Sequence, residues 1–171
     1  MKKAIVTGVG GQDGYYMAQL LSEKGYEVLG LTHKAEQTSD LSDNVRIVEF
    51  DIRNYDGLYK LIEREKPEEI YNFAAQSSSI YSWDDSRGTF ELNFMAPVAI
   101  LESIRDHIPS CRFFQASSAE VFGRDPVETP QTEQTMRQPV TPYAIAKNAV
   151  DEMVDAFRDK YGIFAVSKFL D

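Results

Sequence analysis

The stretch TGVGGQDG, residues 7–14, follows a short apolar run and precedes a segment whose apolar residues recur at helical spacing. Its glycines suit a turn from a strand into a helix. Gly8 permits the tight turn, Gly11 leaves no Cβ between backbone N–H groups and a bound pyrophosphate, and Gly14 lets the helix pack closely. The helix N-terminus adds unpaired donors and partial positive charge. The stretch predicts a dinucleotide pyrophosphate site; the alternative is a glycine-rich turn without a ligand.

Short β-rich runs alternate with segments of helical period along the whole chain. This alternation predicts an α/β fold of the Rossmann type, in which helices cover both faces of a doubly wound parallel sheet. The expected strands are Lys3–Thr7, Glu27–Leu31, Arg46–Phe50, Glu69–Phe73, Cys111–Ala116 and Phe164–Phe169. We expect one nucleotide-binding domain, residues 1–171.

Capping residues mark the expected helix boundaries. The last helix has Thr141 as its N-cap, Pro142 at its first position and Gly162 after its end. A helix within about residues 83–107 contains Pro97, which lacks an N–H group, so we expect a kink or a break there.

Two earlier helices show weaker boundary signals. The first is expected to carry Met17, Leu20 and Leu21 on one inward face, with Gly25 as the residue just after its C-cap, and the second to begin after Asn54 as its N-cap. Residues 123–140 hold three of the seven prolines and form an expected functional loop.

Composition excludes several classes of function. The formal net charge of −9 disfavours a general nucleic-acid or anionic-membrane surface, because the mean field repels phosphate. Cys111 is the only cysteine, which excludes an internal disulfide and a cysteine-rich metal site. We expect Cys111 to be a small, buried, apolar side chain. We expect no metal site, no secretion signal and no membrane span, and hence a soluble cytoplasmic protein.

The end of the second expected strand bears on the choice of cofactor. Where a ribose-binding acid is expected, about 20 residues past the glycines, the chain reads Leu31-Thr32-His33-Lys34. A basic residue without a carboxylate favours a ribose 2′-phosphate, so NADP is preferred to NAD. The alternative is that Lys34 is a solvated loop lysine with His33 as an incidental neighbour.

A second group of residues predicts redox chemistry. Tyr143 and Lys147 share one face of the last helix, where a lysine and the positive helix end favour ionisation of the phenol. An isolated pair of this spacing is more often a surface pair. Here the fifth strand also ends at Ser117-Ser118, on the edge of the sheet where ligands bind.

These segments resemble the extended short-chain dehydrogenase/reductase family that acts on nucleotide sugars, and within it the GDP-mannose 4,6-dehydratases. The matching stretches are VTGVGGQDG, LLSEKGYEVLG, KPEEIYNFAAQSS, FFQASSAEVFG, ETPQTE and PYAIAK. The resemblance implies Ser118, usually threonine in the dehydratases, as a catalytic hydroxyl, Tyr143 as the base and Lys147 as the holder of the nicotinamide ribose. It implies further cofactor contacts by Gln12, Asp13, Ala74, Ala75 and Gln76, and by Asp51 and Ile52, which match positions that flank the adenine.

Glu120 separates reaction classes within this resemblance. The implied sequence is oxidation at C4 by NADP with Tyr143 as base, removal of the C5 proton by Glu120, loss of the C6 hydroxyl as water and hydride return to C6. An epimerase or a simple ketoreductase needs no such base, and for these Glu120 is a solvated carboxylate. Asp84 and Asp85 are adjacent on a helix, so an N-cap role is expected rather than paired catalysis.

The chain also departs from the resemblance. Ser78 stands where the dehydratases usually have histidine, and the segment from Lys34 to Val45 is shorter than theirs. Family members continue for roughly the same length again with a substrate lobe, so we expect a truncated chain carrying the cofactor part. The expected partner is a nucleotide sugar such as GDP-mannose, with a homodimer when the protein is intact. The alternatives are an epimerase or reductase of the same fold, or a non-catalytic NADP-binding domain.

Overall fold

The chain builds a six-stranded, fully parallel sheet with strand order β3-β2-β1-β4-β5-β6. The computed structural model describes residues 1–34, 41 and 44–170. The strands are β1 (Lys3–Thr7), β2 (Glu27–Thr32), β3 (Val45–Glu49), β4 (Glu69–Asn72), β5 (Arg112–Ser118) and β6 (Phe164–Leu170). The strand predictions are thus confirmed, with ends shifted by one or two residues. The order reverses between β1 and β4, which creates a switch point at the carboxyl edge.

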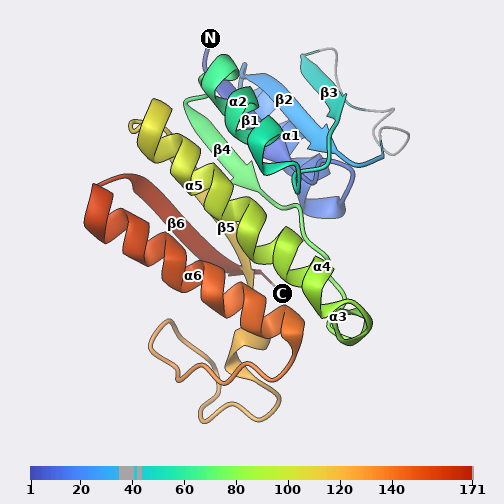
Figure 1. Cartoon of the computed structure of the whole chain (residues 1–171), viewed down its shortest axis with the longest axis vertical. Coiled ribbons are helices and arrows are strands. Elements are labelled where there is room, and N and C mark those ends of the chain that lie inside the picture. The colour runs from blue at the N-terminus through green and yellow to red at the C-terminus, as the bar shows by residue number, and fades with distance from the viewer. Residues whose placement is uncertain (35–40, 42–43, 171) are drawn as a thin grey trace.

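Helices cover both faces of the sheet, as predicted. Helices α2 (Tyr55–Glu65), α5 (Ala96–His107) and α6 (Pro142–Tyr161) lie on one face, and α1 (Gln12–Glu23) lies on the other (Figure 1). Each face has its own apolar core. Leu58, Ile100 and Phe113 belong to the larger cluster, and Val6 and Ala18 to the smaller one beneath α1.

The side chains that α1 turns toward the sheet differ in part from the predicted ones. Ala18 and Leu21 are buried, but Leu20 is 45% exposed, so the prediction that Leu20 points inward is wrong. The close approach of Gly14 to the glycine loop sets the rotation of the helix, and this rotation turns Leu20 outward. Leu20 instead lines a second cavity with Asp13, Tyr16, Met17, Phe73, Phe114 and Leu170.

The helix predicted around Pro97 is interrupted, as expected. Short helices α3 (Tyr81–Asp84) and α4 (Ser86–Phe90) precede a π-helical turn, η2 (Glu91–Met95), and α5 then begins with Pro97 in its first turn. The N–H group of Ala96 donates to the carbonyl of Glu91, which is the hydrogen bond of a π-helical turn. This turn lies just before Pro97, which has no N–H group to donate.

The predicted caps are present. Thr141 Oγ1 accepts from the N–H of Ala144 at 3.1 Å, and the side chain of Asn54 accepts from the N–H of Gly57 at 3.1 Å. Gly162 has φ +67°, the left-handed conformation that ends a helix. The expected N-cap role of Asp85 is confirmed as well, since its carboxylate accepts from the N–H of Gly88 at 2.9 Å.

Residues 123–140 form the irregular loop that was expected, after a single 3₁₀ turn, η3 (Ala119–Phe122). Cys111 is buried, as predicted, and burial raises the pKa of its thiol to about 12. Within the described ranges, no helix combines the length and apolar character that a membrane crossing requires.

Candidate cofactor pocket and catalytic cluster

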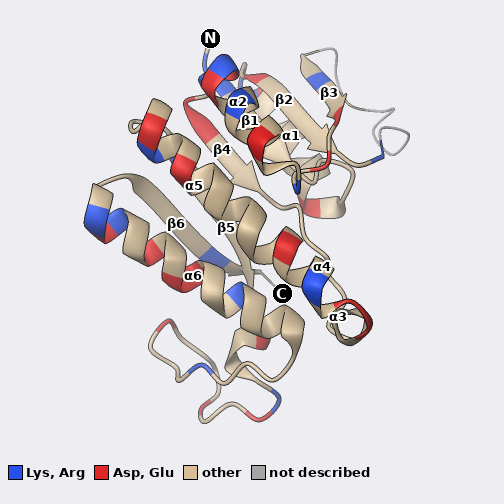
Figure 2. Cartoon of the chain, viewed as in Figure 1, with Lys and Arg blue, Asp and Glu red and all other residues tan. Residues whose placement is uncertain are grey.

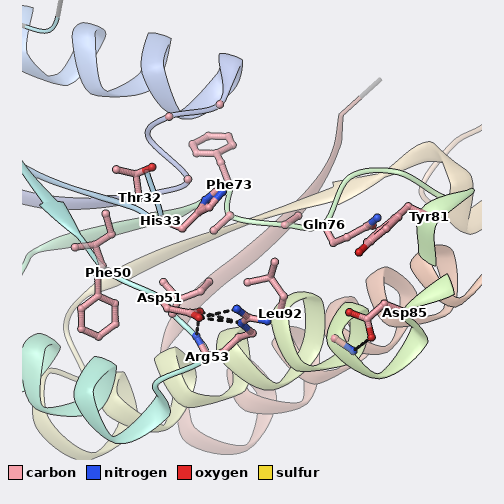
Figure 3. A pocket seen from close by; sticks show the side chains of 18 residues that line it. Thr32, His33, Phe50, Asp51, Arg53, Phe73, Gln76, Tyr81, Asp85 and Leu92 are labelled. Atoms are coloured by element: carbon pink, nitrogen blue, oxygen red, sulfur yellow. Dashed lines mark hydrogen bonds and ion pairs between the residues drawn. The ribbon is translucent and has the colours of Figure 1, made fainter. Parts of the chain in front are cut away.

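A cavity of about 420 Å³ opens at the carboxyl edge of the sheet, above the switch point. Among the predicted cofactor residues it is lined by Gly8, Gly11, His33, Asp51, Ile52, Ala74, Ala75 and Gln76. These residues come from the ends of β1, β2, β3 and β4, which only the sheet brings together. Figure 3 shows Phe50, Thr32 and His33 toward one end of the cavity and Gln76, Tyr81 and Asp85 toward the other.

The glycine loop has the geometry that its sequence predicts. Gly8 has φ +70°, and a Cβ there would lie 2.6 Å from the backbone nitrogen of Ala74. A Cβ on Gly14 would lie 2.3 Å from the Gly8 carbonyl oxygen, so α1 packs directly on the loop. A Cβ on Gly11 would meet only that oxygen, at an ordinary 3.4 Å. Gly8 and Gly14 therefore shape the loop, whereas Gly11 leaves space in the cavity.

Arg53 is a cavity residue that was not predicted. Its guanidinium donates to both carboxylate oxygens of Asp51, at 2.7 to 3.1 Å, and its backbone N–H donates to the same carboxylate (Figure 3). Hydrogen bonding by Arg53 lowers the pKa of Asp51, although burial opposes it. Asp51 is therefore a fixed anion at the predicted adenine end. The sequence signal for Arg53 was its position directly after the predicted cofactor residues Asp51 and Ile52.

The two predicted basic residues at the end of β2 differ in their positions relative to the cavity. His33 lines the cavity, while Lys34 is exposed and does not line it. The backbone of Lys34 is held by Thr32, whose hydroxyl accepts from the N–H of Lys34 at 3.2 Å. Most of the short segment that follows Lys34 lies outside the described residues.

The loop after β4 is fixed by Asn93, another residue that was not predicted. The Asn93 amide accepts from the N–H of Gln76 at 2.8 Å and donates to the carbonyl of Gln76 at 3.0 Å. Asn93 lies in the π-helical turn and is buried. The turn created around Pro97 thus positions an amide that shapes the cavity wall.

Other predicted cofactor residues lie outside the lining of this cavity. Gln12, Asp13 and Gly14 form the first turn of α1 beside it, and Tyr143 and Lys147 lie on α6. Ser78, at the position usually occupied by histidine, is exposed, and its hydroxyl accepts from the N–H of Tyr81 at 3.2 Å.

The structure brings the predicted catalytic residues together where β5 ends and α6 begins. Tyr143 is 8% exposed, and the Ser118 hydroxyl lies close enough to its phenol to affect the pKa of Tyr143. Burial raises the pKa of Tyr143 above its ordinary value; the Ser118 hydroxyl opposes this shift and the charge of Glu120 adds to it. The Ser118 hydroxyl also accepts from the N–H of Glu120 at 3.2 Å, while the Glu120 side chain is exposed. Ser118, Glu120 and Tyr143 therefore form one electrostatic cluster, and Lys147 lies beside it on α6.

Lys147 is almost fully buried on the same helix. Its ammonium donates to the carbonyl of Ala116 at 2.8 Å and lies 5.9 Å from the centre of the Tyr143 ring. Burial lowers the pKa of Lys147 to about 8, although the negative charge of Asp151 opposes the shift. In the chain alone the ammonium thus contacts the strand rather than the phenol oxygen.

A buried polar row connects the glycine loop with Lys147. The Thr7 hydroxyl donates to the Asn72 side-chain oxygen, and the Asn72 amide donates to Gln115 at 2.7 Å. Gln115 in turn donates to the carbonyl of Ala116 at 2.8 Å, the same oxygen that Lys147 contacts. Thr7, Asn72 and Gln115 occupy one register row across β1, β4 and β5. Isolated polar residues in apolar strands were the only sequence signal for this row.

Solved nucleotide-sugar enzymes share this fold. UDP-glucose 4-epimerase from Thermus thermophilus, solved with NAD, superposes with a TM-score of 0.85 at 26% identity, over 96% of this chain and 53% of that one. UDP-glucose 4-epimerase from Thermotoga maritima gives a TM-score of 0.86 at 24% identity, over 94% and 52%. The observed fold is therefore that of the extended short-chain dehydrogenases/reductases.

Sequence comparison narrows the assignment. The chain is 34% identical to the GDP-mannose 4,6-dehydratase of Vibrio cholerae and 36% identical to that of Drosophila melanogaster, in each case over 99% of this chain. It spans about half the length of these relatives, 49% and 46% respectively. The sequence model of the family described as GDP-mannose 4,6 dehydratase matches residues 5–170, nearly the whole sheet and both groups of site residues. The chain therefore belongs to the GDP-mannose 4,6-dehydratase family.

Proposed function

We propose that this chain is the NADP-binding part of a nucleotide-sugar 4,6-dehydratase that converts a GDP-mannose-like substrate into a 4-keto-6-deoxy sugar. The observation that carries the proposal is the cluster of Ser118, Glu120, Tyr143 and Lys147 beside the dinucleotide-type cavity. Cofactor binding alone requires neither a buried phenol nor a carboxylate next to it. The names of the V. cholerae and D. melanogaster relatives support the same reaction.

The residues of the cavity fit a dinucleotide. Gly8 and Gly14 let the loop pack closely on the end of β4 and on α1, and Gly11 leaves space in the cavity before the α1 N-terminus, where the pyrophosphate is predicted. Asp51, fixed as an anion by Arg53, is an acceptor at the predicted adenine end. When bound, NADP supplies the acceptor and later the donor of the hydride exchanged with the sugar carbons.

Tyr143 holds and moves the proton of the sugar 4-hydroxyl in this proposal. A tyrosine phenol is ordinarily protonated at neutral pH, and burial raises the pKa of Tyr143 further, so its action as a base depends on positive charge gathered around it. Lys147 is the cation on the same helix, and the Ser118 hydroxyl lies near the phenol and lowers its pKa. A hydroxyl in that position orients the substrate hydroxyl toward Tyr143.

Glu120 is the proposed base for the second proton transfer. A ketone at C4 acidifies the C5–H bond, and the exposed Glu120 carboxylate is free to take that proton. Glu120 then gives that proton to the C6 hydroxyl, which leaves as water, and the electron pair released at C5 forms a C5=C6 double bond. Hydride return to C6 and a proton added at C5 give the 4-keto-6-deoxy sugar. The exposure of Glu120 in this chain is consistent with a group that receives substrate from the open side.

Preference for NADP over NAD is part of the proposal and rests on Lys34 and His33. His33 lines the cavity and Lys34 is exposed beside it, where a 2′-phosphate would gain a charge-assisted contact. Calorimetric titration should show tighter binding of NADP than of NAD. Lys34→Ala should weaken NADP binding about tenfold and leave NAD binding unchanged, while Lys24→Ala serves as an exposed control. Tighter binding of NAD would contradict this preference.

The reaction is tested with protein expressed from its complete reading frame. NADP and GDP-mannose are supplied, and the sugar is followed by NMR spectroscopy. Formation of a 4-keto-6-deoxy sugar without accumulation of reduced cofactor supports the proposal, and inversion at C4 would instead indicate an epimerase. Glu120→Gln should lower dehydration by at least about a hundredfold and preserve NADP affinity. Asp125→Asn, an exposed carboxylate in the next loop, is the matched control.

A further inference from the structure

Asp151 is a fully buried carboxylate that the proposed reaction does not use. Its Oδ2 accepts from the Ser117 hydroxyl at 2.6 Å and from Nη1 of Arg137 at 3.3 Å. Its Oδ1 accepts no hydrogen bond from any residue that the structure describes. A buried carboxylate with one unbonded oxygen is costly to keep, so its surroundings point to a specific role.

Three turns of α6 contact three consecutive residues at the end of β5. The Ser118 hydroxyl lies near the phenol of Tyr143, Lys147 donates to the carbonyl of Ala116, and Asp151 accepts from the Ser117 hydroxyl. The α6 residues lie one turn apart along a single face, because their spacing is four residues. Asp151 therefore completes the row to which the two predicted catalytic residues of α6 belong.

Asp151 also anchors the long loop between η3 and α6. Arg137 reaches it from residues 123–140 and donates to the Asn148 side chain at 3.2 Å. The Arg137 guanidinium lies 5.3 Å from the centre of the Phe169 ring on β6. Charges of both signs lie along this loop and along α6 (Figure 2). The loop contains two arginines, and the guanidinium group of Arg137 is the one that contacts the Asp151 carboxylate.

The charges around Lys147 come from few elements. On α6 the charge that acts on the ammonium is Asp151, and β5 contributes the neutral carbonyl of Ala116. Asp151 is faced by Ser117 of β5, Ser167 of β6, Arg137 of the loop and Lys147 of its own helix. Burial raises the pKa of Asp151, and these four groups oppose the rise. Lys147 and Asp151 thus each favour the charged form of the other.

We propose that Asp151 is a positioning residue for the Ser118, Tyr143 and Lys147 cluster: it holds β5 through Ser117, anchors the 123–140 loop through Arg137 and places a negative charge one helical turn from the Lys147 ammonium. This role goes beyond the proposed reaction. It concerns the charge state of the chain alone, so its test requires neither cofactor nor substrate.

The test is an NMR titration of the chain labelled with ¹³C-lysine, in which the Lys147 signal is assigned by its loss in Lys147→Met. Asp151→Asn preserves the shape of the side chain and removes its charge. It should lower the titration midpoint of Lys147 by at least about one pH unit, a tenfold loss of proton affinity. Asp155→Asn, an exposed carboxylate one turn further along α6, should leave the midpoint unchanged. An unchanged midpoint in Asp151→Asn overturns the proposal.

Two further measurements separate this role from simple structural support. Arg137→Met removes a positive charge and should not lower the Lys147 midpoint, whereas general loosening of the site would move both variants in the same direction. The same variant should speed proteolytic cleavage within residues 123–140, with Arg124→Met as control.

If Asp151→Asn does not fold, ¹³C-carboxyl shifts of the unmodified chain decide the question. A protonated Asp151 at pH 7 would overturn the proposal.

Discussion

The ammonium of Lys147 donates a 2.8 Å hydrogen bond to the carbonyl of Ala116, an oxygen that also accepts from Gln115. This oxygen is the point where helix α6 and the buried polar row of the sheet meet. Lys147 is held there as a buried cation, and several of the expected properties of the protein follow from that position.

Lys147→Met should change how stability depends on pH. The pKa of Lys147 is about 8 in the folded chain, below its ordinary value of 10.5, so the unfolded chain binds this proton more tightly. Its burial therefore destabilises the fold below pH 8, and the penalty is relieved as pH rises toward 10.5. Relative to Lys147→Met, the unmodified chain should gain roughly 2 kcal/mol between pH 7 and pH 10. Urea unfolding at several pH values measures this gain, and parallel curves for the two proteins would contradict it.

Gly11→Ala and Gly14→Ala should separate ligand binding from folding. A Cβ at Gly11 fits the loop, so stability should fall by less than about 1 kcal/mol, while NADP affinity should drop at least about tenfold because the methyl group enters the cavity. A Cβ at Gly14 meets the Gly8 carbonyl oxygen at 2.3 Å and should destabilise the fold by about 1–3 kcal/mol. Calorimetric NADP titration and urea unfolding give the two readouts. Equal effects of the two substitutions on both readouts would refute the separation.

Asn72→Leu should destabilise the chain strongly. The substitution removes the middle of the buried polar row and leaves Thr7 and Gln115 without their shared partner. Unsatisfied buried polar groups of this kind cost about 1–3 kcal/mol each, so a loss of roughly 2–4 kcal/mol is expected. Thermal and urea unfolding measure the loss. Asn44→Leu, at an exposed position before β3, should change stability by less than about 0.5 kcal/mol.

Glu65→Gln should weaken the fold at neutral pH but much less in acid. Glu65 joins the end of α2 to β1 and β3 through Lys3, at 3.3 Å, and Arg46, at 2.9 Å. Burial raises its pKa, but hydrogen bonds from Arg46, Arg64 and Lys3 outweigh it and bring the pKa down to about 2. The stabilisation is complete above pH 4.5 and is lost as pH falls toward 2.

Solvent around Arg46 and Arg64 screens these pairs, so the expected difference between Glu65→Gln and the unmodified chain is about 1–2 kcal/mol at pH 7. Urea unfolding at pH 7 and at pH 2 measures it. A difference that persists undiminished at pH 2 would assign the effect to packing rather than to charge.

Local sequence signals were sufficient for the helix ends and the glycine loop. Gly8 and Gly162 require left-handed backbone, and Thr141 and Asn54 cap the helices that they precede. Pro97 interrupts its helix because it lacks an N–H group. These features depend on a few neighbouring residues, so they can be predicted from the sequence alone.

The sequence by itself therefore predicted the alternating parallel fold, the glycine turn between β1 and α1, and four residues, Ser118, Glu120, Tyr143 and Lys147, that the structure brings together where β5 ends and α6 begins. Only the tertiary structure decided the outward position of Leu20, the contact between Arg53 and Asp51, and the burial of Asp151. It also created the polar row, since Thr7 and Asn72 lie 65 positions apart and Asn72 and Gln115 lie 43 apart. Such contacts depend on strand order and on helix rotation, which are set by packing across the whole sheet rather than by any local pattern.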